Sequence, residues 1–486
     1  MDSFPLLTLL ATIASTFLGV YALNSFTLSL IAAKKILSKD CEDADPPAQE
    51  PLPTVTIQIP IYNEGPLIES VLENVTSLDY PKDRLEIQIL DDSTDAETLW
   101  KEQKLVEKYG GEGYDLRLIH RENRGGYKAG ALNNGLKMAK GDYIAVVDAD
   151  TYSPGNFLME LIPQFSKDER LAFVQARCEY TDRWFNWITE SNAIERDVHH
   201  LIEQPAKSWY NLLPNFSGKA GIWRRDILEK YGWDESVLTE DIELSYRVQL
   251  DGWKSLYLHH PTCMIELPLS LTALKTQQMR WTAGFAQSFR KLWRPLIKSR
   301  ELTRSQKLET LIFLFTPITH IVALAAIFVW MLAAILEPEA TLGLWLNNPV
   351  FSIFIASISI APNISVIMAI LRSRERTLRK LLTIPLTIIM ATANLIANAK
   401  GALQGFFRKN LIFEKTAKYG ITQNNRKHKA ACNYTIGRLI KENSLELIAA
   451  ILVMTAIAKL LLQGQTMSSV PLAFIALSWL ISVFQK

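Results

Sequence analysis

Residues 143–150 read Tyr-Ile-Ala-Val-Val-Asp-Ala-Asp, a short apolar run that ends in two carboxylates one residue apart. The run predicts a buried β-strand from Tyr143 to Val147. In an open α/β sheet, ligands bind at the carboxyl ends of the strands, which is where Asp148 and Asp150 fall. Two carboxylates in this position can hold a hard divalent cation and leave coordination positions for water and a diphosphate. An ordinary solvated turn has the same pattern, so the surrounding sequence must decide between the two interpretations.

Similar apolar runs recur between residues 40 and 300 and alternate with helical patterns. The predicted strands are Val55–Tyr62, Leu85–Leu90, Leu116–Ile119, Tyr143–Val147 and Leu171–Gln175. Helical stretches such as Gly126–Ala139 separate them. This alternation predicts a soluble α/β domain with a mostly parallel sheet. The proline-rich segment Pro46–Pro53 is predicted to be a linker.

Long apolar runs lie on both sides of this domain. They are Phe4–Ala33, Leu311–Leu336, Leu344–Leu371, Leu381–Ala399, Leu445–Leu462 and Val470–Phe484. Runs of roughly 18 or more apolar residues predict membrane-spanning helices. Lys34 and Lys35 follow the first run, so the positive-inside rule places the α/β domain in the cytoplasm. A signal peptide is disfavoured, because the sequence shows neither a basic start nor a convincing small-residue cleavage site.

The run Leu381–Ala399 is the exception among these predicted spans. If it crossed the membrane, the segment Lys400–Lys441, with ten Lys or Arg against one acid, would lie on the far side. We therefore expect an interfacial or re-entrant helix, which Asn394 and Asn398 also favour. Five spans and a cytoplasmic carboxyl end follow, with six spans as the alternative.

Composition excludes few functions. The formal charge is +2, from 52 basic and 50 acidic residues, and gives no overall argument for a nucleic-acid partner. The cysteines Cys41, Cys178, Cys263 and Cys432 are far apart and show no zinc-type spacing. They are therefore predicted to be free thiols in a reducing compartment.

Three further motifs fall at predicted strand ends or helix starts. Tyr62 ends the first predicted strand and Glu64 follows it. The aromatic ring can stack on a base, and the carboxylate can accept a hydrogen bond from a ribose hydroxyl. Asp91 and Asp92 close the second strand. The segment Arg124–Gly130 opens a helix, so its glycine-rich backbone and Lys128 could meet phosphate charge. An ordinary glycine turn is the alternative for this loop, and the Walker spacing is absent.

Thr239, Glu240 and Asp241 begin a predicted helix. Helix capping alone explains a threonine followed by acids. An inverting sugar transfer offers a second explanation, since it needs one carboxylate to deprotonate the acceptor hydroxyl. Residues 277–281 read Gln-Gln-Met-Arg-Trp, in a stretch that also has the features of a membrane-surface helix. There, Trp281 offers an apolar plane for a sugar ring and Arg280 could neutralise a leaving diphosphate.

In order, these motifs are Asp91-Asp92, Asp148-Ala149-Asp150, Thr239-Glu240-Asp241 and Gln277-x-x-Arg280-Trp281. They resemble the D, DxD, TED, QxxRW signature of processive inverting glycosyltransferases, the cellulose synthase superfamily. The segments 88–95, 121–132 and 216–224 look most like the cellulose synthase-like glucomannan (β-mannan) synthase branch. Residues 413–420 are similar to the family's gating loop, although Lys415 stands where the family usually has valine. Residues 215–218 read Asn-Phe-Ser-Gly instead of the Phe-Phe-Cys-Gly of cellulose synthases, so cellulose is not carried over as the product.

The resemblance implies a GT-A catalytic domain that uses Mg²⁺ or Mn²⁺ and a nucleotide-sugar donor. Tyr62, Glu64 and one of Asp91 or Asp92 would hold the nucleoside, and Lys128, Gln277 and Arg280 would face the diphosphate. Asp148 and Asp150 would engage donor and metal, and Asp241 would be the general base. Trp281, Phe216, Ser217, Gly218 and Glu240 would lie at the acceptor.

The implied function is the polymerisation of a β-linked polysaccharide from UDP-glucose or GDP-mannose, with possible translocation of the chain. The predicted domains are a transmembrane helix at 1–36, a cytoplasmic GT-A domain at 40–268, interfacial helices at 269–305 and a transmembrane region at 306–486 that contains the gating-loop-like segment 400–444. A prokaryotic protein would lie in the plasma membrane, whereas Golgi fits a plant relative. One rival is a transferase that adds a single sugar to a polyprenyl phosphate, a ceramide or a diacylglycerol. A transporter or scaffold is disfavoured, because the predicted spans contain few ionisable groups.

Overall fold

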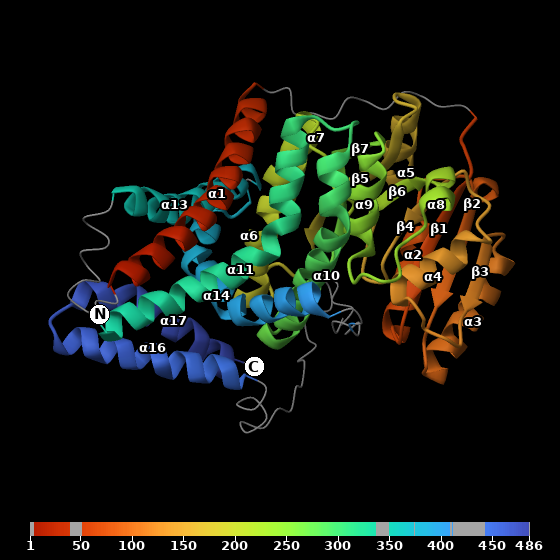
Figure 1. Ribbon diagram of the computed structural model, residues 1–486. Coiled ribbons are helices and arrows are strands. Elements are labelled where there is room, and N and C mark those ends of the chain that lie inside the picture. Colours follow the sequence, from red (N-terminus) through yellow and green to blue (C-terminus); the bar gives the residue numbers. More distant parts are fainter. Residues whose placement is uncertain are drawn as a thin grey trace.

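The structure, a computed structural model, describes residues 4–38, 51–336, 349–373, 375–408, 411 and 443–485. One side of the molecule is a β-sheet with helices on both faces, and the other is a group of long helices (Figure 1). Helix α10 (Leu271–Lys298) stands between these two parts. The predicted combination of a GT-A-like α/β domain with apolar helices is confirmed.

The sheet has seven strands in the order β3-β2-β1-β4-β6-β5-β7. Their bounds are β1 Val55–Ile61, β2 Leu85–Asp91, β3 Asp115–His120, β4 Tyr143–Val146, β5 Leu171–Tyr180, β6 Gly221–Arg224 and β7 Lys254–Ile265. Strand β6 is antiparallel to both neighbours, and the other pairings are parallel. The five predicted strands are present, whereas β6 and β7 were not predicted. Strand β7 was missed because Pro261 follows two histidines in its middle, and proline within a run argues against a strand.

The core lies on both faces of the sheet, and β4 shows why. Alternate residues of a strand point to opposite faces, so Ala145 packs in one apolar cluster while Ile144 and Val146 pack in the other. Both faces are covered by helices, which explains a strand that is apolar at every position. The covering helices are α2 Gly65–Thr76, α3 Ala96–Gly111, α4 Tyr127–Leu136, α5 Phe157–Leu161, α8 Arg225–Tyr231 and α9 Glu240–Leu250.

Helices α6 (Trp187–Asp197) and α7 (Gln204–Trp209) pack toward the long helices, with the π-helical turn η3 (Val198–Glu203) between them. Two short 3₁₀ turns, η1 (Lys82–Arg84) and η2 (Ile162–Ser166), complete this part. The remaining helices are α1 Phe4–Leu37, α11 Arg304–Leu336, α13 Pro349–Ser373, α14 Thr377–Phe407, α16 Ser444–Leu462 and α17 Thr466–Phe484.

Four helices in the described parts of the chain are long and apolar enough to cross a membrane. They are Leu9–Leu37, Arg304–Leu336, Thr377–Phe407 and Ser444–Leu462. Two predicted spans, in α13 and α17, count among the shorter apolar helices, Ile360–Ser373 and Ser468–Phe484. Helix α14, which was expected to be interfacial or re-entrant, has the length and hydropathy of a span. The number of spans and the side on which the α/β domain lies stay predictions.

The polar residues of helix α14 pack against other helices of the protein. It lies along α10 and α6 and also touches α11 and α17. Asn394 is fully buried and Asn398 nearly so, and the Asn398 amide donates to Gln278 Oε1 of α10 (3.1 Å). The contact with Gln278 therefore accounts for Asn398, whereas Asn394 is buried between helices without a hydrogen-bond partner in the described residues.

The gating-loop-like segment 413–420 lies outside the described residues, as do Cys41 and Cys432. Cys178 and Cys263 are buried free thiols, as predicted for these two.

Candidate active site

The three strands β1, β2 and β4 end at one edge of the sheet, because β1 pairs in parallel with both of the others. The residues beyond these ends line a cavity of about 530 Å³, a size typical of ligand sites. Most of the predicted site residues line it: Tyr62, Glu64, Asp92, Lys128, Asp148, Asp150, Ser217, Gly218, Glu240, Asp241, Gln277, Arg280 and Trp281. Asp91 and Phe216 do not.

The two neighbouring aspartates of β2 have different surroundings. Asp91 is fully buried and makes a 2.6 Å contact with His120 Nδ1, and its other oxygen accepts from the backbone N–H of Ser93. Asp92 lines the cavity and receives two hydrogen bonds from Arg121, at 2.7 and 2.6 Å. Of the two alternatives for a nucleoside-binding carboxylate, the structure places Asp92 at the cavity.

The end of β1 carries a stacked pair that the sequence reasoning missed. The Arg124 guanidinium lies over the ring of Tyr62, with its Cζ 3.4 Å from the ring centroid. Arg124 comes from the glycine-rich loop before α4, so this contact joins that loop to β1. A flat guanidinium on an aromatic ring is a favourable cation–π arrangement, and both groups line the cavity beside Glu64.

Lys128 connects three parts of the site. Its Nζ donates to Asp148 Oδ1 (2.5 Å) and to the carbonyl oxygen of Gly218 (2.8 Å). Lys219 donates to the other oxygen of Asp148 (3.3 Å). The Asp148 carboxylate therefore lies between two cations, which come from the first turn of α4 and from the segment before β6.

The surroundings of Asp148 and Asp150 fit a divalent cation that shares its ligands with a diphosphate. Within the described residues, no group of three or more His, Cys, Asp or Glu side chains could hold a metal ion by itself. Magnesium, however, is commonly bound by one or two carboxylates together with substrate phosphate oxygens. Asp150 is almost buried, and both carboxylates face the cavity. Burial lowers the pKa of Lys219, but Asp150 and Asp148 raise it more, so the local field favours positive charge.

The first turn of α9 places two carboxyl groups at the cavity. Asp241 Oδ1 accepts from the backbone N–H of Ile242 (2.8 Å). Burial raises the pKa of Asp241, although Lys128 opposes the shift. Burial and the neighbouring Asp241 raise the pKa of Glu240 to about 7. Raised carboxyl pKa values in a cavity are typical of groups that accept or release protons near neutral pH.

Gly218 lets the backbone approach Asp241. It has a φ of +79°, and a Cβ at this position would lie 2.8 Å from Asp241 Oδ2. A side chain here would be strained by the backbone conformation and would collide with the carboxylate. Ser217, the preceding residue, also lines the cavity. Phe216 instead points into the core, where it is fully buried among Phe173, Trp223 and Trp233, so its predicted place at the acceptor is not what the structure shows.

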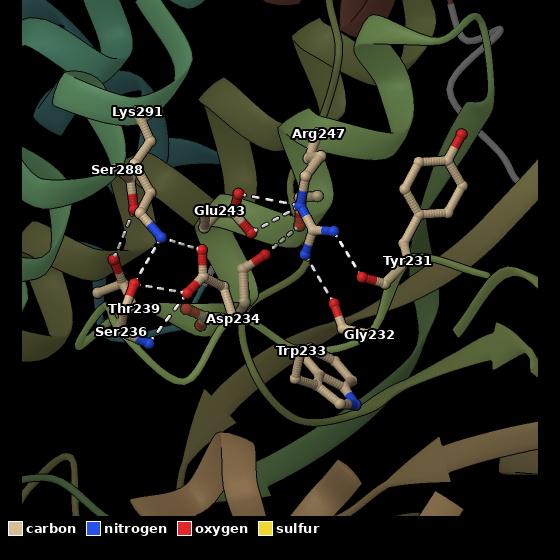
Figure 2. A network of polar contacts seen from close by, with 12 residues as sticks. Tyr231, Gly232, Trp233, Asp234, Ser236, Thr239, Glu243, Arg247, Ser288 and Lys291 are labelled. Atoms are coloured by element: carbon tan, nitrogen blue, oxygen red, sulfur yellow. Dashed lines mark hydrogen bonds and ion pairs between the residues drawn. The ribbon is translucent and has the colours of Figure 1, made fainter. Parts of the chain in front are cut away.

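The Thr239 hydroxyl does not cap α9. Its Oγ1 pairs with Ser288 Oγ of α10 (3.2 Å), and no capping hydrogen bond to the helix is present (Figure 2). The loop before Thr239 is joined to α10 as well, because Lys291 contacts both Asp234 and Ser236. Thr239 therefore does not cap α9. Its hydroxyl connects the start of α9 to α10.

Helix α10 carries the predicted diphosphate and acceptor residues. Gln277, Arg280 and Trp281 all line the cavity from this helix. Burial lowers the pKa of Arg280, whereas Glu240 and Asp241 raise it, which indicates that these charges lie close together. Phe313, Pro317 and His320 of α11 also line the cavity.

Several cavity residues belong to none of the motifs. They are Asn192, Glu195, Arg196, His199 and His200. They lie on α6 and η3, a segment with no turn, glycine or acid pattern to mark it. A π-helical turn is a frequent feature of functional sites, but sequence periodicity does not reveal one.

A comparison with protein families finds a match to the part of the chain that contributes most of the cavity residues. A family model described as Glycosyltransferase like family 2 matches residues 53–284. The chain is 31% identical over 369 residues to glucomannan 4-beta-mannosyltransferase 7 of Arabidopsis thaliana, with 74% of this chain and 64% of the relative covered. It is 34% identical over 300 residues to glucomannan 4-beta-mannosyltransferase 1 of Oryza sativa subsp. japonica, with 60% and 58% covered. The chain thus spans about three-fifths of the length of these relatives.

A solved structure shares the fold. The mannosyltransferase PcManGT from Pyrobaculum calidifontis, determined with GDP-Man and Mn²⁺, superimposes with a TM-score of 0.58 and 21% sequence identity. The match covers 82% of this chain and 100% of that one. At this level of identity the likeness shows the common fold.

Proposed function

The chain carries a glycosyltransferase domain of Glycosyltransferase like family 2 at residues 53–284, and on this premise we propose that it transfers hexose from a nucleotide sugar to a growing β-linked polysaccharide. One observation supports this most strongly. A carboxyl group at a helix start, Asp241, faces the same cavity as a lysine–carboxylate pair, Lys128 and Asp148, and an aromatic plane, Trp281. These are the parts that an inverting transfer needs: a base, a diphosphate site and an acceptor platform.

The reaction follows from these positions. Asp241 accepts the proton of the acceptor hydroxyl, and the hydroxyl oxygen then forms a bond to the anomeric carbon of the donor sugar. The bond from that carbon to the diphosphate oxygen breaks, and the nucleoside diphosphate leaves with the bonding electrons. Lys128 and Arg280 stabilise the charge of the leaving group. A divalent cation held by Asp148 and Asp150 would supply further stabilisation of the diphosphate charge.

The remaining donor contacts belong to this proposal. Tyr62 and Glu64, with Asp92 rather than Asp91, would hold the nucleoside. Gln277 would face the diphosphate, and Ser217, Gly218 and Glu240 would lie beside the acceptor end. GDP-mannose is the first donor to test, because the curated relatives are named as mannosyltransferases and the similar solved structure contains GDP-Man. UDP-glucose is the second.

Membrane embedding completes the proposal. The α/β domain would lie in the cytoplasm, with α10 at the membrane surface and the long apolar helices in the bilayer. Residues of α11 and α14 also line the cavity, and a growing glycan would pass along these long helices for translocation. The apolar side chains Phe285, Phe313 and Pro317 along this part would equally suit a lipid-linked acceptor. The size of the product decides between the two.

The experiment uses the full chain, purified and reconstituted in lipid with Mn²⁺ or Mg²⁺. Nucleotide release and product size are measured with GDP-mannose and with UDP-glucose. A high-molecular-weight glycan is expected from one of the donors. Recovery of a single sugar on extractable lipid would instead support the lipid acceptor, and absence of transfer from both donors would contradict the assignment.

The near-isosteric Asp241→Asn variant is the matched control for that experiment. It is expected to lower transfer by about 10²–10⁴-fold, because the amide cannot accept the acceptor proton. Donor affinity, measured by titration of the nucleotide sugar, should change little, since the base acts on the acceptor. Turnover close to that of the unmodified protein would remove Asp241 from the role of base.

A further inference from the structure

Helix α6 presents an arginine that contacts both ends of the Gln277–Trp281 segment. Arg196 Nη2 donates to Gln277 Oε1 (2.5 Å), and its Nε donates to Asn192 Oδ1 (2.9 Å). The Arg196 Cζ lies 4.4 Å from the centroid of the Trp281 ring. A single guanidinium therefore connects the first and last residues of a motif from which it is 81 positions away.

The helix that carries Arg196 is anchored along its length. Asn186 and Thr189 form a reciprocal capping box at its start. Glu190 in its first turn accepts from Arg379 of α14 (2.7 Å). At its end, Asp197 accepts two hydrogen bonds from Arg183, at 2.8 and 2.7 Å, and both side chains are buried. Arg196 is thus presented from a fixed element.

The contact with Gln277 sets the direction of the amide. A glutamine amide has one acceptor oxygen and two N–H donors, and its orientation follows from its hydrogen-bond partners. Because Oε1 accepts from Arg196, the N–H groups are the part of Gln277 left for a ligand. A hydrogen-bond donor such as an amide N–H suits the anionic oxygens of a diphosphate.

The contact with Trp281 restricts the ring. The guanidinium lies over the indole, so one face of the ring is occupied and its plane is held. A sugar ring that stacks on Trp281 must then use the opposite face. Such a fixed, one-sided platform places an acceptor hydroxyl reproducibly relative to Asp241.

We propose that Arg196 is a positioning residue that holds Gln277 and Trp281 in one arrangement. Gln277 then presents its N–H groups to the diphosphate, and Trp281 presents a single face to the acceptor sugar. The proposal rests on the proposed glycosyltransferase function. Arg196 lies outside the sequence motif. If it only stabilised the fold, its replacement would not specifically change the use of the acceptor.

The test uses Arg196→Met and Arg196→Lys in the full chain in lipid, with Arg117→Lys on β3 as a matched control. Arg196→Met should lower kcat by about tenfold or more, because small displacements of substrate-positioning groups strongly slow transfer. The KM for the acceptor should rise, while donor affinity changes less. Arg196→Lys should not restore activity, since a point charge lacks the planar fork that both stacks and donates. Arg117→Lys should match the unmodified protein.

A double variant separates positioning from an independent effect. In a Trp281→Ala background, Arg196→Met should cause a smaller loss than in the unmodified protein, because the contribution through Trp281 is already absent and only the contribution through Gln277 remains. Additive losses, or a loss confined to donor affinity, would overturn the proposal. So would kcat and acceptor KM values in Arg196→Met equal to those of the unmodified protein. If the unmodified protein transferred sugar from neither donor, the proposed function itself would fail.

A measurement without turnover tests the same contact. In protein labelled with fluorotryptophan, the Trp281 fluorine resonance is assigned by its disappearance in Trp281→Phe. It should be single in the unmodified protein and should broaden or split in Arg196→Met but not in Arg117→Lys. An unchanged resonance in Arg196→Met would overturn the proposal whichever substrate the protein uses.

Discussion

At the scale of single residues, each acid in the cavity has its own partners. Asp92 is paired with Arg121, and Asp148 with Lys128 and Lys219. Asp241 accepts a hydrogen bond from a backbone N–H at a helix start, and its pKa is raised by burial. Three chemically identical side chains therefore have different environments, and we expect different consequences when each is changed.

The raised carboxyl pKa values predict the pH dependence of transfer. The base must be ionised, so activity should fall as the pH falls through the coupled pKa values of Asp241 and Glu240. Burial raises the pKa of both groups, that of Glu240 to about 7, so the acid limb should lie above the ordinary carboxylate value of about 4. The measurement is kcat against pH with saturating substrates. In Glu240→Gln the limb should move to lower pH, because a neighbouring negative charge is removed; an unmoved limb would contradict this coupling.

Asp150→Ala tests the metal site. The variant should lose transfer together with its response to Mn²⁺, because one of the two proposed carboxylate ligands is missing. Manganese binding is followed by electron paramagnetic resonance in the presence of a nucleoside diphosphate. Asp168→Ala, which removes a surface partner of Lys254, is the control and should bind metal normally. Activity that persists in a strong chelator would refute a metal at Asp150.

At the scale of elements, close packing sets the position of α10. Gly284 faces Thr239, and a Cβ there would lie 2.5 Å from Thr239 Cγ2. On the other side, Cβ atoms at Gly401 and Gly405 of α14 would lie 2.4 Å and 2.2 Å from carbonyl oxygens of α10. Glycines four residues apart are typical of helices that approach closely. The helix that carries Gln277 and Trp281 is thus held between the start of α9 and α14.

Gly405→Ala should therefore disturb the site from a distance. The added methyl group must push α14 away from Ala283 of α10, two residues after Trp281, so we expect reduced kcat and lower thermal stability. The control is Gly110→Ala in α3, where nothing lies within 4 Å of the new Cβ. That change should be neutral or slightly stabilising, because alanine is the better helix former. Normal activity in Gly405→Ala would show that α14 does not position α10.

At the scale of the whole molecule, ion pairs join the α/β domain to the long helices. Lys207 of α7 pairs with Glu309 of α11 (2.9 Å), and Lys275 of α10 pairs with Glu446 of α16 (2.9 Å). All four side chains are largely buried. A buried pair is costly to break because the remaining charge has no partner. These contacts help to hold the two parts of the molecule together.

Lys207→Met should consequently lower the free energy of unfolding by about 3–5 kcal/mol, since Glu309 is left buried and unpaired. A second change, Glu309→Gln, should recover much of that loss. Thermal unfolding in detergent or lipid gives the comparison. Lys101→Met, which removes a surface pair with Glu97, should cost less than about 1 kcal/mol. Equal effects of the buried and surface changes would show that the first pair does not join the two parts.

Local pattern was sufficient for the α/β domain and the positions of five strands, whereas the cavity acids also needed the order of the motifs and their resemblance to a known family. Strand periodicity and helix starts depend on neighbours within a few residues, and parallel strands place their carboxyl ends together. Asp148, Asp150 and Asp241 were chosen because the ordered motifs resemble a known family, and they share one cavity in the structure. Their roles remain predictions that the variants above would test.

Tertiary packing alone decided the rest. It directed Asp91 to His120 and Asp92 to the cavity, turned Phe216 into the aromatic core, and gave Asn398 a partner on α10. It also brought Arg196 to Trp281. These outcomes depend on side-chain directions and on contacts between residues that are often tens to more than a hundred positions apart. No local periodicity encodes such contacts, because they exist only once the helices have packed against the sheet and against one another.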